Sequence, residues 1–175
     1  KRRTTDFWRV SAFDAEDGSQ LLAVADIATG AKRENGLDYA AAPPQHTAVD
    51  EGVRLEASAM TPRWFTQFEQ VLTSGPPFQI NDHPKSVVLI RHADRRPLDA
   101  KAIVSMADSP MPRVFFIAKE PRMASTLTLS THIYATEAEI SEAGGQFVII
   151  EANTAVIRHS ALNQEVRLFR KDGLL

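Results

Sequence analysis

Residues 86–107 read SVVLIRHADRRPLDAKAIVSMA, and this stretch decides the fold. Its first six residues, Ser86 to Arg91, are rich in apolar and β-branched side chains, which predicts a strand. Residues 95–98, Arg-Arg-Pro-Leu, interrupt the chain. Asp99 is a favourable N-cap, so residues 100–107 are predicted to form a helix that ends before Pro110. We expect its buried face to carry Ile103, Val104 and Ala107.

The last third of the chain predicts three long strands. Ser125 to Thr136 alternates threonine with apolar residues, and an acidic connection follows at residues 137–145. Residues 146–157 and 159–170 predict the second and third strands. From residue 86 the order is therefore strand, helix and three strands. One helix against an antiparallel sheet is an α+β layout.

The first 30 residues predict a hairpin. An aromatic-rich run at residues 7–13 and an apolar run at residues 21–27 are separated by a turn cluster at residues 14–20. An isolated hairpin is marginally stable, so we expect it to pair with further structure. Residues 30–62 have the length of an interdomain linker. Trp64 to Leu72 fits both a helical face and an extended segment.

Composition narrows the classes of function. The 175 residues suit one ordinary domain with part of a second. The 20 basic and 22 acidic residues nearly cancel, which disfavours a nucleic-acid partner. The sequence has no apolar run of about 18 residues, so we expect no membrane span and a cytoplasmic location. The absence of cysteine excludes disulfides, thiolate catalysis and cysteine-ligated metals.

Motifs for metals and cofactors are missing from the sequence. The five histidines do not form an H-E-x-x-H motif, and His132 is expected to be a packed strand residue. The chain contains neither a G-x-S-x-G elbow nor a G-x-G-x-x-G or P-loop pattern. We therefore predict no metal and no cofactor.

Residues 90–100 and 103–112, followed by residues 125–134 (STLTLSTHIY), resemble the C-terminal hotdog domain of the type II acyl-CoA thioesterases and their wider superfamily. Proteins of that family carry two hotdog domains, each a long antiparallel sheet wrapped around one helix. The resemblance thus implies a double-hotdog protein of the α+β class.

The N-terminal residues resemble the end of a first hotdog in the same family. The resemblance rests on residues 7–13, the Asp17-Gly18 turn and residues 23–28, with further support at 36–39 and 43–44. It implies that residues 1–40 are the last strands of a first hotdog whose start is absent, and that residues 41–63 are a linker. Residues 64–175 would be a complete second hotdog, opened by a strand from Phe65 to Leu72. Pairing of sheet edges implies a homo-oligomer.

The resemblance also implies an activity and a site. The substrate would be an acyl-CoA or acyl-carrier-protein thioester, hydrolysed by an activated water. The carboxylate of the family's site corresponds to Asp108, its hydroxyl to Thr126 and its amide to Gln164. Asn163 competes with Gln164, because a shift of one residue turns a strand side chain to the other face of the sheet.

Each of these assigned site residues also has a simpler structural interpretation. Asp108 could have no role beyond ending the helix. Thr126 could be present simply because threonine favours strands. A hotdog that binds an acyl chain or a carrier protein without catalysis is the alternative function. Hydratase chemistry is disfavoured, because Arg113 stands where that class needs a histidine. Six basic residues are candidates for contacts with coenzyme A phosphates, or for a solvated surface: Arg91, Arg95, Arg96, Arg113, Lys119 and Arg122.

Overall fold

The computed structural model describes residues 5–32, 36–37, 39–59, 61–120, 122–171 and 173–175. The chain divides into two compact units, residues 1–38 and residues 39–175.

The first unit is the predicted hairpin. Strand β1 (Thr5–Phe13) pairs with strand β2 (Leu21–Gly30) in antiparallel register. Because side chains alternate between faces, Trp8 opposite Ile27 and Val10 opposite Ala25 lie on one apolar face. The other face carries the exposed ion pair between Arg9 and Asp26. Within this unit all residues of both strands are exposed, those of the apolar face included.

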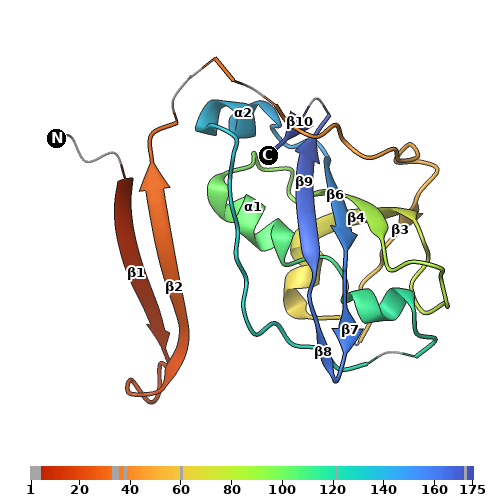
Figure 1. Cartoon of the computed structure of the whole chain (residues 1–175), viewed down its shortest axis with the longest axis horizontal. Coiled ribbons are helices and arrows are strands. Elements are labelled where there is room, and N and C mark those ends of the chain that lie inside the picture. Colours follow the sequence, from red (N-terminus) through yellow and green to blue (C-terminus); the bar gives the residue numbers. More distant parts are fainter. Residues whose placement is uncertain (1–4, 33–35, 38, 60, 121, 172) are drawn as a thin grey trace. The chain divides into compact units, whose positions relative to one another are not determined.

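The second unit is built on one antiparallel sheet, which Figure 1 shows in side view. Its strand order is β10-β9-β6-β5-β4-β3. The strands are β3 (Val53–Arg54), β4 (Phe68–Ser74), β5 (Ser86–His92), β6 (Val148–Asn153), β9 (Glu165–Arg170) and β10 (Gly173–Leu174). A separate small ladder joins β7 (Ile157–Arg158) to β8 (Ala161–Leu162). The helices are the 3₁₀ turns η1 (Arg63–Gln67) and η2 (Arg113–Phe116), α1 (Ala100–Ala107) and α2 (Glu137–Glu142).

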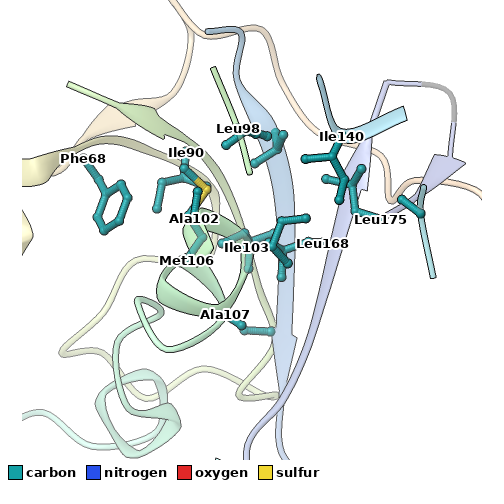
Figure 2. Packing of buried hydrophobic residues seen from close by; sticks show 14 residues of the cluster. Phe68, Ile90, Leu98, Ala102, Ile103, Met106, Ala107, Ile140, Leu168 and Leu175 are labelled. Atoms are coloured by element: carbon teal, nitrogen blue, oxygen red, sulfur yellow. The ribbon is translucent and has the colours of Figure 1, made fainter. Parts of the chain in front are cut away.

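Helix α1 lies across one face of the sheet (Figure 1). It begins as predicted, because the Asp99 side chain accepts a hydrogen bond from the N–H of Ala102 at 2.7 Å. The buried face that this helix presents consists of Ala102, Ile103, Met106 and Ala107, which pack on side chains from four strands and α2 (Figure 2). Val104 remains 40% exposed, so its assignment to the buried face is wrong.

The opposite face of the sheet is also covered. Val71, Leu89 and Phe169 belong to a second buried cluster there, against which Ala41 and Val49 of the preceding segment pack. Burial on both faces explains why β5 reads as an unbroken apolar run instead of an alternating one. The predicted strand at residues 86–91 is confirmed and extends to His92.

The segment around Trp64 contains both predicted conformations in succession. Residues 63–67 form η1 after Pro62, whose φ of −61° suits a helical start. Strand β4 begins only at Phe68. The expected opening strand from Phe65 is therefore wrong for its first three residues.

The long strands predicted in the last third are only partly present. Residues 125–135 form no strand, because alternation and threonine content favour an extended chain but do not supply a neighbouring strand with which to pair. Residues 137–142 form α2 behind a capping box between Thr136 and Glu139, where only a connection was expected. The other two predicted strands are interrupted at residues 154–156 and 163–164, because β7 and β8 form a separate small ladder that turns at His159 and Ser160, whose φ values are 51° and 61°.

None of the helices in the described ranges is long and apolar enough to cross a membrane.

Candidate active site

Asp108 is the residue at which α1 ends. It has a φ of −89° and a ψ of −4°, and its side chain is exposed. The next residue, Ser109, is buried and donates both its N–H and its hydroxyl to the carbonyl of Met106, at 3.1 and 2.7 Å. This bonding turns the chain sharply out of the helix. The Asp108 carboxylate thus lies at the carbonyl end of α1, so N–H donors for a reacting oxygen must come from other elements.

Thr126 meets Asp108 although 18 residues separate them in the sequence. The Thr126 hydroxyl donates to Oδ1 of Asp108 over 3.3 Å. Both side chains are exposed, and Thr126 lies on the extended segment that follows η2. A carboxylate accepts up to about four hydrogen bonds, so Asp108 keeps the capacity to bind water beside this threonine.

Gln164 reaches the same loop from the start of β9. Its Nε2 donates to the carbonyl oxygen of Pro110 at 3.3 Å, two residues after Asp108. Its Oε1 accepts a hydrogen bond from Nε of Arg113 at 3.2 Å. In the described part of the chain, Gln164 is therefore joined to the Asp108 loop through Pro110, and no hydrogen bond connects it to Asp108 itself.

Asn163, the competing amide, forms its hydrogen bonds away from the Asp108 loop. Its Oδ1 accepts hydrogen bonds from the Thr154 hydroxyl and from the N–H groups of Ala155 and Val156, at 3.0 to 3.1 Å. These bonds hold the connection between β6 and β7. The geometry thus favours Gln164 over Asn163 as the amide of the candidate site.

Arg113 lies fully buried beneath the loop, a position that the sequence did not predict. Its guanidinium donates to the Ser86 hydroxyl at 2.6 Å and to the carbonyl oxygens of Met111, Pro84 and Ala152. The group stacks over the Phe116 ring, 4.2 Å from its centre. Burial lowers the pKa of Arg113 to about 10, which still leaves it protonated at neutral pH. The sequence signal that could have indicated its burial is the apolar run Val-Phe-Phe that directly follows the arginine.

Comparison with known proteins identifies the family. Residues 36–175 match the family described as the acyl-CoA thioesterase C-terminal domain. The chain belongs to this family. No curated protein matches the chain significantly.

A solved structure supports the fold of this thioesterase-family chain. It is the crystal structure of a conserved protein of unknown function with a hot dog fold from Alicyclobacillus acidocaldarius. The TM-score is 0.88 at 20% sequence identity, over 99% of this chain. The chain spans 65% of the length of that protein. The likeness confirms the α+β hotdog fold that the sequence predicted.

Two of the six basic candidates for coenzyme A phosphates are engaged within the thioesterase domain. Arg113 is buried, so a phosphate contact through it is contradicted. Arg91 is 12% exposed, donates to Glu69 and lies over the Phe147 ring, 4.0 Å from its centre. The other four are exposed: Arg95, Arg96, Lys119 and Arg122.

One expectation for the histidines is contradicted. His132 is exposed, so its assignment as a packed strand residue is wrong. His92 is buried instead, at 3% exposure. Among the residues with described positions, no group of three or more histidines and carboxylates is arranged to hold a metal ion.

Proposed function

We propose that this chain hydrolyses the thioester of an acyl-CoA or an acyl-carrier protein, with Asp108 as the base that activates water. The observation that carries the proposal is the hydrogen bond from Thr126 to Asp108 in a domain of a thioesterase family. A carboxylate and a hydroxyl from distant parts of the chain meet at the exposed end of α1, where a substrate can reach them.

The chemistry needs no covalent enzyme intermediate. Asp108 accepts a proton from water as the oxygen attacks the thioester carbonyl carbon, which gives a tetrahedral oxyanion. Thr126 holds the carboxylate in one orientation through its bond to Oδ1. The side-chain amide of Gln164 supplies N–H donors near the same loop, which stabilise the water or the oxyanion. Collapse of the oxyanion expels the thiolate, which takes the proton, and leaves a carboxylic acid.

The test is hydrolysis of a panel of acyl-CoA thioesters, followed with a thiol-reactive dye. Asp108→Asn is expected to lower kcat by about a hundredfold or more, because asparagine cannot accept the proton. Asp99→Asn is the matched control, since it makes the same chemical change at the other end of α1 and asparagine remains a good N-cap. Equal activity of the two variants and the unchanged protein would reject Asp108 as the base.

A non-catalytic hotdog that binds an acyl chain or a carrier protein is the second candidate. The exposure of Asp108 and Thr126 favours it, because catalytic carboxylates commonly work in sites from which bulk water is excluded. This second function is supported if calorimetry shows that an acyl-CoA binds while the dye detects no released thiol. Turnover well above background rejects it.

We also propose the domain arrangement implied by the family. The hairpin of β1 and β2 would be the end of a first hotdog (residues 1–40) and residues 64–175 the second hotdog. Residues 41–63 would be a linker that packs on the second hotdog through Ala41, Val49 and β3. Support comes from the exposed apolar face around Trp8 and Ile27, which an additional layer would bury. Double-hotdog units would then pair into homo-oligomers. Light scattering that shows a clean monomer would count against this pairing.

A further inference from the structure

Arg113 combines two properties that are rarely found together. Its side chain is fully buried, and all the acceptors that it reaches in the described part of the chain are neutral oxygens. Burying a charge without a carboxylate partner opposes folding, so hydrogen bonds to those oxygens must offset the cost. A stabilising role alone would be served as well by an apolar side chain of similar volume.

The position of Arg113 connects the candidate site to the sheet. Ser86 and Ala152, which it contacts, are paired residues at the ends of β5 and β6. Met111 belongs to the loop that begins at Asp108, and Gln164 directly precedes β9. One guanidinium thereby attaches both the loop and the glutamine to two strands of the sheet, β5 and β6.

The bonding also decides which way the amide of Gln164 faces. A guanidinium only donates, so the atom of Gln164 that faces Arg113 must be the oxygen, Oε1. A backbone carbonyl only accepts, so the atom that faces Pro110 must be the nitrogen, Nε2. The two partners require the same orientation, and a flipped amide would lose both hydrogen bonds.

We propose that Arg113 is a positioning residue that holds Gln164 with its NH₂ group toward the Asp108 loop. Gln164 then acts toward water or substrate only as a donor, and Asp108 carries the acceptor role. Nε2 has two hydrogens, of which the Pro110 carbonyl takes one, so one remains for a water or an oxyanion. This inference rests on the proposed hydrolysis.

The first arm of the test is a double-mutant cycle on kcat with Arg113→Met, Gln164→Ala and the double variant. We expect each single variant to lower kcat by about a hundredfold, as loss of one oriented donor does, with less change in KM. The double variant should be no slower than either single variant, because Arg113 acts through Gln164. If the two losses multiply, Arg113 serves the fold alone and the proposal is overturned.

The second arm uses Gln164→Glu, which keeps the side-chain shape and the buried arginine. The new carboxylate pairs one oxygen with Arg113 and sets the other against the Pro110 carbonyl, so its stability in urea unfolding near pH 7 reports the balance of these two contacts. Any gain should disappear once acid protonates the carboxylate. Because the variant offers no N–H donor, its kcat should fall as far as that of Gln164→Ala. Retained kcat would overturn the proposal even where Arg113→Met fails to fold.

A third arm separates this inference from the proposed function. The NMR resonances of the Gln164 side-chain amide can be assigned by their loss in Gln164→Ala. They should shift in Arg113→Lys, because the lysine ammonium group cannot replace the planar set of donors of the guanidinium. If the unchanged protein hydrolyses no acyl-CoA, the proposed function fails. These resonances still test whether Arg113 contacts and orients Gln164. Unshifted resonances reject control of Gln164 by Arg113 whatever the activity.

Discussion

Oδ1 of Asn163 accepts a hydrogen bond from the hydroxyl of Thr154 at 3.0 Å, which ties the start of one strand to the end of another. The N–H groups of Ala155 and Val156 share the same acceptor. The next residue, Gln164, instead faces Arg113 and the loop after α1. Two adjacent amides therefore have separate tasks, one in a turn and one at the candidate site.

Asn163→Ala should lower the free energy of unfolding by about 0.5–1.5 kcal/mol, because it removes the acceptor that the donors of the turn share, and the exposed N–H groups can bond water instead. Urea unfolding measures this loss. The kcat of the folded variant should fall less than that of Gln164→Ala. If Asn163→Ala lost more activity than Gln164→Ala while staying folded, the assignment of the two amides would have to be exchanged.

Gly145 allows two backbone segments to approach closely. A Cβ at this position would collide with the carbonyl oxygen of Arg95 and lie 3.0 Å from its carbonyl carbon. Since those atoms are backbone, Gly145→Ala should destabilise the domain by about 1–3 kcal/mol. Gly173→Ala is the control, because nothing lies within 4 Å of the added methyl, and its effect should stay within about 0.5 kcal/mol. Thermal unfolding of both variants compares them, and equal melting temperatures would contradict the prediction.

The sequence predicted the elements that local signals specify. The apolar run of β5 and the Asp99 cap of α1 need no knowledge of the rest of the chain, and both are confirmed. The segment at residues 125–136 was predicted as a strand from its alternation, but pairing depends on a neighbour that alternation does not identify. The His159–Ser160 turn was missed because it uses non-glycine residues with positive φ.

The candidate site was predicted in part. Asp108 and Thr126 came from the resemblance, and the structure brings them into contact. Arg113 was predicted to contact coenzyme A phosphates or to lie on a solvated surface, because sequence alone does not show that Ser86, Met111, Ala152 and Gln164 surround it. Burial of a charge among neutral oxygens depends on how segments that are distant in the sequence pack together, so a local sequence pattern does not predict it.

Glu69 should make stability fall in acid. The hydrogen bond from Arg91 lowers the pKa of Glu69, and the charges of Arg91, Arg95 and Arg54 add to the effect. A lowered pKa in the folded state means that the stabilisation is present above the ordinary value, near 4.5, and is lost as the pH falls through the folded value. The carboxylate is 28% exposed, so we expect about 1 kcal/mol or less.

Glu69→Gln tests this contribution. The variant should be less stable than the unchanged protein at pH 7 in urea unfolding, and the difference should shrink as the pH is lowered below about 4.5. Asp94→Asn is a suitable control, because Asp94 contacts Arg96 in an exposed pair and should matter little. A difference between Glu69→Gln and the unchanged protein that stays constant from pH 7 to pH 3 would contradict the assignment.

His92 should make stability fall at a higher pH than Glu69 does. Its ring stacks on Phe68 with 5.3 Å between ring centres, and its Nε2 is buried with no hydrogen-bond partner among the described residues. Burial lowers the pKa of His92, and the positive charge of Arg96 lowers it further, while Asp94 and Asp99 oppose the shift. The folded protein therefore holds this imidazole neutral at pH values where the unfolded chain protonates it.

The sign of the effect follows from proton binding. Between the lowered folded pKa and the ordinary value near 6.5, the unfolded state binds more protons, so stability rises with pH in that window. We expect urea unfolding at pH 7.5, 6.5 and 5.5 to show a falling free energy of unfolding for the unchanged protein. His92→Phe keeps a stacked ring but cannot titrate, so its curve should be flatter over this range. Parallel curves for the two proteins would show that His92 is not the titrating group.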